Sequence, residues 1–385
     1  MPGHASSHVF PPRDYGRPRV AVVMLSLVPG AMGGTETYAR ELTRHLDRGR
    51  IDAHAFVPRG AEGFSAGIPE IVVPEVRAGA SVPARLAATT ASIAVRRRIL
   101  DRLGSAELAH LPFSSSVPPL PSRVARVVTI HDVVHLDMPE TFSRAERLYR
   151  TAFYDVPARQ ADAVITISQF ARRTIVEKMK VPEHRIHTIP LGVDLSAFTP
   201  GTVERENILY YPARPYPHKN HERLFAAVEL LHREDPTLRL VLSGEGRERL
   251  GTLPPFVEHV GLVPFDELRA LYQRARLLVF PSLYEGFGLP PLEAMASGCP
   301  VAASNAASIP EVVGDAAELF DAHTVAGIAA GIRRALNRTD DLRARGLRHV
   351  TGVSWRRCVA AHEDVYLEVA AERRRRLRAG VGRRD

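Results

Sequence analysis

The chain has 385 residues, 45% of them hydrophobic, and a formal net charge of +8. This length and apolar content are enough for two domains with buried cores. No apolar run approaches the roughly 18 residues of a membrane span, residues 1–19 lack the apolar core of a secretory signal, and two cysteines exclude a disulfide scaffold. We therefore expect a cytoplasmic protein.

The positive charge is concentrated at the end of the chain. Residues 373–385 hold seven Arg and one Asp, which is +6 of the total of +8. This tail is either a solvated helix end or a contact with anionic lipid at the inner membrane face, where each basic residue contributes about 1 kcal/mol. A nucleic-acid partner is not expected, because no aromatic residue is interleaved with these Arg residues and no known binding motif occurs.

Short apolar runs alternate with helical segments along the first half of the chain, which predicts βαβ units and a parallel sheet. Strands are expected at residues 20–27, 54–57, 71–73, 108–111, 125–130 and 163–167. Helices are expected at residues 37–46, 83–103, 143–160 and 169–179. Ser168 is a suitable N-cap for the last helix, and Pro157 should bend or end the helix that contains it.

A second series of strands follows a linker at about residues 191–203, where Gly, Asp and Pro punctuate the chain. Its strands are expected at residues 208–211, 238–242, 257–260, 277–280, 301–303 and 318–320. The sequence thus predicts an α/β protein with two Rossmann-like, doubly wound domains facing across a cleft. The domains comprise residues 1–195 and 196–354, and a helix with a basic tail, residues 355–385, crosses back to the first domain through Trp355.

Glu285 and Glu293 lie eight residues apart around a predicted strand-to-helix loop. Ligands of open α/β sheets bind at the carboxyl ends of strands, and carboxylates accept paired hydrogen bonds from vicinal diols. Backbone N–H groups at the helix start between them can face a phosphate. The segment suits a ligand with a sugar at one end, a ribose at the other and an anion between them.

Two cations follow the first strand of the second domain. Arg214 and Lys219 precede a helix, and such a pair can clamp a diphosphate, although isolated basic residues in loops are usually solvated. Gly244 and Gly246 repeat the strand–glycine–helix arrangement after the next strand, where they either support a nucleotide or form a plain tight turn.

The first domain offers weaker signals. Gly33 and Gly34 follow the first strand and open a helix, so they either approach an anion or form a structural turn; Glu36 suits the first helical turn. His131 ends a strand and either donates to a substrate hydroxyl or phosphate or serves packing, whereas Asp132 is expected to cap or orient.

Several chemistries lack their motifs. The chain contains no GxGxxG, no Walker A sequence, no HExxH and no GxSxG. It also contains no Asp-x-Asp, which argues against a metal-bridged diphosphate and predicts a site with no metal and no cofactor. Arg, Lys and backbone N–H groups would then hold the anionic charge.

Together these segments resemble glycosyltransferase family 4, a family of retaining enzymes with the GT-B fold. Glu285 and Glu293 match the E-x7-E motif of its donor site. The resemblance covers nearly all of the chain, and its other supports are Gly33-Gly34 with Glu36, His131-Asp132, DAVITISQFARR, IPLGVD at 189–194, Arg214 with Lys219 and Asn220, and Gly244-Glu245-Gly246. Residues 129–194 are most similar to bacterial mannosyltransferases that use GDP-mannose in polysaccharide or glycolipid assembly.

The resemblance implies a role for each of these segments. Glu285 should contact the donor hexose, and Glu293 should contact the ribose. The backbone amides of Gly286, Phe287, Gly288 and Leu289 should touch the sugar or the distal phosphate. Arg214 and Lys219 should hold the diphosphate, which Gly33 and Gly34 approach from the first domain. His131 should lie beside the reacting sugar.

The sequence therefore predicts a hexosyltransferase that moves sugar from a nucleotide diphosphate to a hydroxyl of a glycan, glycolipid or small-molecule acceptor. Two alternatives remain. One is a dinucleotide-dependent oxidoreductase or epimerase, against which the missing GxGxxG argues. The other is a non-catalytic scaffold at the membrane surface.

Overall fold

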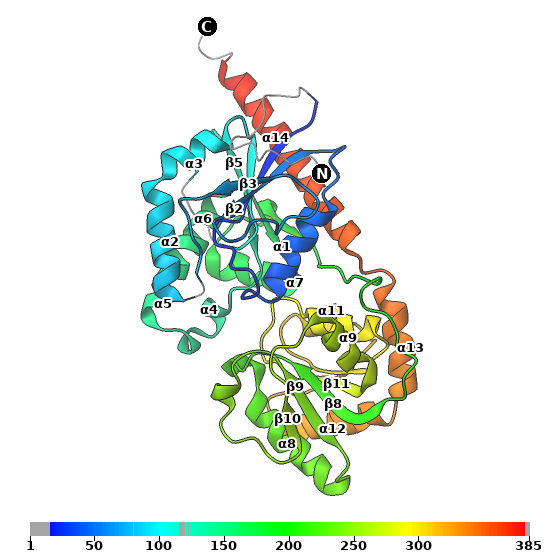
Figure 1. Cartoon of the computed structure of the whole chain (residues 1–385). Coiled ribbons are helices and arrows are strands. Elements are labelled where there is room, and N and C mark those ends of the chain that lie inside the picture. Colours follow the sequence, from blue (N-terminus) through cyan, green and yellow to red (C-terminus); the bar gives the residue numbers. More distant parts are fainter. Residues whose placement is uncertain (1–15, 80, 115–119, 122, 382–385) are drawn as a thin grey trace, which may run out of the picture. The chain divides into compact units, whose positions relative to one another are not determined.

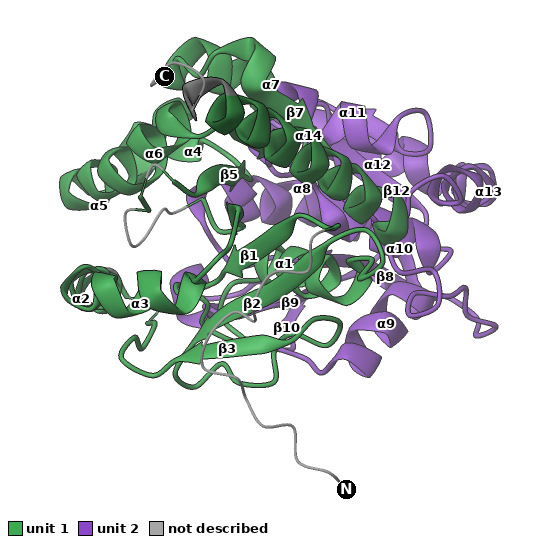
Figure 2. Ribbon diagram, turned by 90° about the horizontal axis from the view of Figure 1, so that it is seen from above, with its two compact units in different colours: residues 1–167, 171–190, 355–385 green, residues 168–170, 191–354 purple. Residues whose placement is uncertain are grey.

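The computed structural model describes residues 16–79, 81–114, 120–121 and 123–381. The chain divides into two compact units, coloured separately in Figure 2. The first unit contains residues 1–167, 171–190 and 355–385, and the second contains residues 168–170 and 191–354. Each unit is built on its own parallel sheet with helices (Figure 1).

The sheet of the first unit has seven parallel strands in the order β3-β2-β1-β4-β5-β6-β7. These strands are β1 (Arg19–Val23), β2 (Asp52–Pro58), β3 (Glu70–Val73), β4 (Leu108–Leu111), β5 (Ala125–Ile130), β6 (Ala163–Thr166) and β7 (Ile186–Thr188). Central strands such as β1 and β4 are buried along their whole length, because helices cover both faces of such a sheet and favour continuous apolar runs.

Helices of the first unit connect these strands and close the chain. They are α1 (Gly34–His45), α2 (Val82–Ala94), α3 (Arg96–Leu103), α4 (Val134–Asp137), α5 (Arg144–Arg150), α6 (Val156–Gln160), α7 (Gln169–Thr174), whose first two residues belong to the second unit, and α14 (Trp355–Val381).

The second unit has a sheet of six parallel strands in the order β10-β9-β8-β11-β12-β13. Its strands are β8 (Glu206–Pro212), β9 (Arg239–Ser243), β10 (Val257–His259), β11 (Ala275–Phe280), β12 (Val301–Ser304) and β13 (Glu318–Phe320). Its helices are α8 (His221–Glu234), α9 (Phe265–Arg274), α10 (Leu289–Ala296), α11 (Ile309–Val313), α12 (Val325–Leu336) and α13 (Thr339–Val350).

Both sheets reverse their winding direction at one point. In the first unit the chain runs from β1 outward to β3 and then returns to place β4 on the other side of β1. In the second unit the same reversal sets β11 beside β8. Ligands of doubly wound sheets bind in the crevice at the carboxyl ends of the two strands that flank such a reversal. The loops after β8 and β11 are therefore the first place to look for a site.

The expected α/β fold with two parallel sheets is confirmed, and the deviations are local. The strand β7 and the short helix α4 were not expected. The predicted helix at 143–160 is interrupted by a π turn, Thr151–Asp155. Pro157 follows this turn and has no N–H to donate to the preceding turn, so the widened turn accommodates it within α6. The predicted helix at 83–103 is divided at Val95 into α2 and α3.

The C-terminal helix α14 returns to the first unit, where it packs beside α1 and against β4, β5 and β6 (Figure 1). Trp355, at its start, is buried. Further along, α14 joins the sheet through a chain of buried polar side chains. His362 Nε2 lies 2.8 Å from the Tyr38 hydroxyl, which lies 2.8 Å from Thr129 Oγ1. His110 lies 2.8 Å from Thr129 and 2.7 Å from the Tyr366 hydroxyl.

The direction of every hydrogen bond in this chain follows from one carbonyl group. His362 Nδ1 lies 2.8 Å from the Cys358 carbonyl oxygen, which can only accept, so Nδ1 donates, and in the neutral ring Nε2 accepts from Tyr38. Thr129 then donates to Tyr38, and His110 donates to Thr129 and accepts from Tyr366. Both imidazoles are neutral in this arrangement.

Acid should therefore weaken this network. Burial lowers the pKa of His362 to about 4 and that of His110 well below its usual value. An unfolded histidine, with a pKa of about 6.5, binds a proton at a higher pH than these folded ones. Between pH 6.5 and 4 the unfolded state thus holds more protons, and the free energy of unfolding decreases as the pH falls.

We predict that His362→Gln, whose neutral amide can both donate and accept, flattens the decline of unfolding free energy between pH 6.5 and 4. Tyr38→Phe should cost about 1–3 kcal/mol at pH 7.5, because it leaves buried partners unsatisfied. Denaturant titrations followed by the fluorescence of Trp355, the only Trp, measure both effects. His184→Gln, at an exposed position, is the control. A His362→Gln profile parallel to the wild type would contradict the role given to the network.

Candidate active site

The crevice of the second unit receives both cations and both carboxylates that the sequence singled out. Arg214 and Lys219 follow β8, and Glu285 follows β11, the neighbouring strand across the reversal. Glu293 lies within α10, which leads away from the same loop. The fold thus brings Lys219 and Glu285, which are 66 positions apart in the sequence, into contact.

Lys219 and Glu285 form an ion pair in this crevice. Lys219 Nζ donates to Glu285 Oε1 at 2.5 Å, and both side chains are largely shielded from solvent. The chain has only three Lys among its 51 basic residues, and Lys219 is the only one in the second unit. Lys supplies a compact point charge that the planar guanidinium of Arg does not reproduce. Because Lys is so rare in this chain, composition alone already draws attention to Lys219.

The loop that carries Lys219 is fixed to the end of β11 by its neighbour Asn220. Asn220 has a left-handed backbone, φ 64°, and its buried side chain donates to the carbonyls of Pro281 at 3.2 Å and Ala322 at 2.8 Å. The backbone N–H of Leu283 donates to the His218 carbonyl at 2.8 Å. These bonds fix the loop that carries Lys219 relative to the loop that carries Glu285.

Glu293 occupies a different environment about one turn into α10. The Tyr272 hydroxyl donates to its Oε2 at 2.8 Å. Burial raises the pKa of the Glu293 carboxyl to about 7, and the bond from Tyr272 opposes that rise. Near neutral pH the carboxyl is therefore divided between its neutral and charged forms. A ligand that donates hydrogen bonds to it favours the carboxylate.

The segment between the two Glu residues presents backbone groups. Gly288 has φ +115° and precedes α10. The first turn of α10 contains Pro290 and Pro291, which have no N–H. The backbone N–H groups that can bind an anion at this helix start are therefore those of Leu289 and of the loop before it.

Buried hydroxyls fix the carbonyl groups of the same loop. Ser308 donates to the carbonyls of Glu285 and Phe287, both at 2.9 Å. Ser168 donates to the Gly286 carbonyl at 2.8 Å. Sequence reasoning did not find Ser308 or Tyr272, because serine and tyrosine form no motif at these separations, and it named Asn220 only as part of the resemblance.

Arg214 lies beside the glycine turn after β9. Its Nη2 pairs with Glu245 Oε2 at 2.8 Å. Gly246 has φ +96°, and a Cβ there would lie 2.9 Å from the ring of Pro215. The turn at Gly244 and Gly246 therefore allows the close approach of the Arg214 loop, in agreement with the tight-turn interpretation.

The remaining predicted residues belong to the first unit. Gly33, with φ 57°, precedes α1, and Gly33 and Gly34 are both exposed. Glu36 stands in the first turn of α1, as expected, and its Oε2 accepts from the Gly30 N–H at 2.8 Å. A ligand can approach the backbone at Gly33, since a Cβ built there meets no atom within 4 Å.

His131 follows β5 and packs edge-on against Tyr38, with ring centroids 4.8 Å apart. Its Nε2 lies 2.8 Å from the Pro112 carbonyl and must donate to it. Burial lowers the pKa of His131, so the neutral ring presents Nδ1 as an acceptor. The adjacent Asp132 accepts from the Val134 N–H at 3.1 Å, which confirms its expected capping role.

Comparisons with known proteins agree with this arrangement. Residues 32–197 match the family described as Glycosyltransferase Family 4, and residues 194–346 match Glycosyl transferases group 1. O-antigen chain mannosyltransferase B of Escherichia coli is 34% identical over 64% of this chain and 71% of its own length. A D-inositol 3-phosphate glycosyltransferase of Salinispora tropica is 27% identical over 90% of this chain and 83% of its own.

Solved structures share the fold. The sucrose-phosphate synthase of Thermosynechococcus elongatus superimposes with a TM-score of 0.75 at 20% identity, covering 92% of this chain and 100% of that one. HepE of Anabaena, solved in complex with UDP and glucose, gives a TM-score of 0.66 at 18% identity, covering 92% and 100%.

These matches set aside the oxidoreductase and scaffold alternatives. The chain is a glycosyltransferase of the GT-B fold, and it belongs to glycosyltransferase family 4.

Proposed function

We propose that this glycosyltransferase moves mannose from GDP-mannose to a hydroxyl of a glycan, glycolipid or small-molecule acceptor, with retention at the anomeric carbon and without a metal or cofactor. The observation that supports the proposal most is the Lys219–Glu285 ion pair in the crevice of the second unit, with Glu293 on the adjoining helix. The mannosyltransferase names of relatives at 34% identity support the choice of sugar.

Each side chain of the crevice has a part in donor binding. Glu285 accepts from hydroxyls of the hexose, and Glu293 accepts from the ribose diol. The amides of Gly286, Phe287, Gly288 and Leu289 contact the sugar and the distal phosphate. Gly244 and Gly246 support the nucleotide beside Arg214. In the first unit, Gly33 and Gly34 approach the diphosphate, and His131 lies beside the reacting sugar.

The charges of the crevice match those of the donor. Lys219 and Arg214 are each paired with a carboxylate, Glu285 and Glu245, and these pairs keep both cations in place at little electrostatic cost. A diphosphate brings about two negative charges. When it binds, the cations turn toward the phosphates, and Glu285 turns to the sugar hydroxyls.

Transfer replaces one C–O bond by another. The bond from the anomeric carbon to the leaving phosphate oxygen breaks, and a bond to the acceptor oxygen forms on the same face. The departing phosphate takes the acceptor proton, so no carboxylate nucleophile is needed. Lys219, Arg214 and the loop amides stabilise the negative charge that develops on the diphosphate.

The basic tail gives this proposal a membrane component. Arg374 forms a bidentate pair with Glu107 at 2.7 and 3.0 Å, whereas Arg378 and Leu377 are exposed. Arg383 and Arg384 lie outside the described residues. Within the described part of the chain, none of the helices combines the length and apolar character that a bilayer crossing requires. We propose that residues 373–385 contact anionic lipid peripherally.

GDP-mannose should raise the melting temperature more than UDP-, dTDP- or ADP-sugars do, because a ligand of the native state stabilises it. With excess EDTA, the first product detected by proton NMR should be the α-mannoside. Loss of turnover in EDTA would contradict metal independence, and a β-mannoside would contradict retention. Equal shifts with every nucleotide sugar would contradict the choice of donor.

Lys219→Ala should reduce the rate of GDP release from bound GDP-mannose by at least about 10²-fold, the scale for removing one preorganised charge-stabilising donor. Lys219→Arg should also reduce this rate, because the planar guanidinium of Arg is larger and differently shaped than the compact ammonium group of Lys. The matched control is Lys178→Ala, which removes another Lys–carboxylate pair at 2.5 Å, to Asp137 in the first unit. A single-turnover rate of Lys219→Ala near that of the wild type would contradict the proposal that Lys219 stabilises the charge on the diphosphate.

The affinity for GDP-mannose should increase from pH 6 to pH 8. Glu293, with its pKa of about 7, loses its proton over this range, and its carboxylate then accepts hydrogen bonds from the ribose hydroxyls. GDP-mannose itself has no phosphate group that titrates in this range. Titration calorimetry should show the pH slope in the wild type and not in Glu293→Gln. A slope that survives the substitution would assign the titration to another group.

A further inference from the structure

Two buried serine hydroxyls hold three consecutive carbonyl groups of the loop before α10. Ser308 Oγ lies 2.9 Å from the carbonyl oxygens of Glu285 and Phe287. Ser168 Oγ lies 2.8 Å from the carbonyl oxygen of Gly286. Both serines are completely buried. Since a carbonyl oxygen can only accept, both hydroxyls donate their protons to this loop.

The directions of these carbonyls fix the directions of the N–H groups that follow them. In a planar trans peptide group the C=O and the next N–H point in opposite directions. The carbonyls of Glu285 and Phe287 converge on one hydroxyl, so the N–H groups of Gly286 and Gly288 both point away from Ser308. The N–H group of Phe287 likewise points away from the second serine.

These three N–H groups are not used by the protein itself. Among the residues that the structure describes, none accepts a hydrogen bond from the N–H of Gly286, Phe287 or Gly288. Phe287 and Gly288 are nevertheless buried. A buried N–H group without an acceptor is rare in native proteins, and successive N–H groups in a loop form a concave site for an anion.

Ser308 supports this loop instead of the helix that it precedes. It stands at the N-cap position of α11, where a serine hydroxyl ordinarily accepts from the helix's own N–H groups, yet its side chain makes no such bond. Ala307, just before it, has a left-handed backbone with φ 53°, which residues with a Cβ rarely adopt. Backbone strain of this kind is found at binding sites, where the surrounding structure maintains it.

Ser168 is fixed through the same short helix. Ser168, Gln169 and Phe170 belong to the second unit. Glu311, in the first turn of α11, accepts from the N–H of Gln169 at 2.7 Å and from the N–H of Phe170 at 3.1 Å. The start of α11 therefore determines where both hydroxyls meet the loop.

We propose that Ser308 and Ser168 are positioning residues for the donor. They orient the N–H groups of Gly286, Phe287 and Gly288 toward the distal phosphate of GDP-mannose, the phosphate that is bonded to mannose. Donors that are oriented in advance stabilise the charge that this phosphate gains as the bond to mannose breaks. The inference rests on the proposed function and adds to it the side chains that set the geometry of the loop.

The test uses GDP, which has the distal phosphate, and GMP, which lacks it. In titration calorimetry, Ser308→Ala should weaken the binding of GDP about 10-fold, the scale on which one charge-assisted hydrogen bond changes affinity. The same substitution should leave the binding of GMP unchanged. It should also reduce the single-turnover rate of GDP release from GDP-mannose by at least about 10-fold. Ser168→Ala leaves the start of α11 intact, and it should change GDP binding and release in the same direction.

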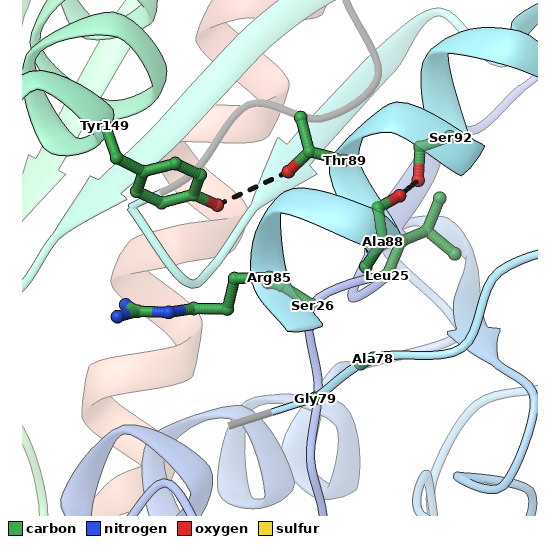
Figure 3. Close-up of a pocket in the computed structure, with 9 residues that line it drawn as sticks. All are labelled: Leu25, Ser26, Ala78, Gly79, Arg85, Ala88, Thr89, Ser92 and Tyr149. Carbon is green, nitrogen blue, oxygen red and sulfur yellow. Dashed lines mark hydrogen bonds between the residues drawn. The ribbon is translucent and has the colours of Figure 1, made fainter. Parts of the chain in front are cut away.

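Ser92→Ala is the matched control. The buried Ser92 hydroxyl donates to the Ala88 carbonyl at 2.8 Å in the first unit (Figure 3). Its removal deletes a bond of the same kind outside the donor loop. Ser92→Ala should lower the melting temperature, as the other two substitutions do, and should leave the binding of both GDP and GMP unchanged.

A purely structural role of the two serines would appear as a lower melting temperature with unchanged binding of GDP, and this result would overturn the proposal. Equal weakening of GDP and GMP binding by Ser308→Ala and Ser168→Ala would overturn it as well, because the effect would then not depend on the distal phosphate. Failure of the proposed function would have a different signature, since the wild-type protein would then release no GDP from GDP-mannose.

Discussion

The reversal of winding direction between β8 and β11 is the constraint on which the donor site depends. It makes neighbours of two loops that are far apart in the sequence, and it sets Lys219 against Glu285 at 2.5 Å. In the proposed mechanism the ion pair serves two purposes. It positions a cation for the diphosphate, and it positions a carboxylate that accepts from the sugar hydroxyls once the cation has an anion to bind.

The two glutamate carboxylates lie in different electrostatic environments. Glu285 is partnered by a cation, whereas among the described residues the carboxylate of Glu293 accepts a hydrogen bond from the Tyr272 hydroxyl alone. The first carboxylate is matched electrostatically, and burial raises the pKa of the second to about 7. In the proposed donor complex, ribose hydroxyls that donate to Glu293 would favour its charged form, so that binding and ionisation are coupled.

Most of this fold could be predicted from the sequence, because buried parallel strands are continuous apolar runs and helices between them are amphipathic. The short strand β7 could not be predicted, because its three residues at the edge of the sheet are too few to show a hydrophobic periodicity. The site residues with charges, such as Lys219 and Glu285, follow strand ends and were found. Tyr272 and Ser308 act through hydrogen bonds to partners distant in sequence, and no local pattern predicts such contacts.

The central claim is that the crevice of the second unit holds an intact nucleotide sugar between its cations and its carboxylates. The most direct measurement is a crystal structure of the protein with bound GDP-mannose. The account predicts the diphosphate in contact with Lys219 and Arg214, the ribose hydroxyls donating to Glu293, and the mannose bonded to Glu285. A nucleotide bound elsewhere, or a ribose remote from Glu293 with Lys219 still paired to Glu285 alone, would contradict it.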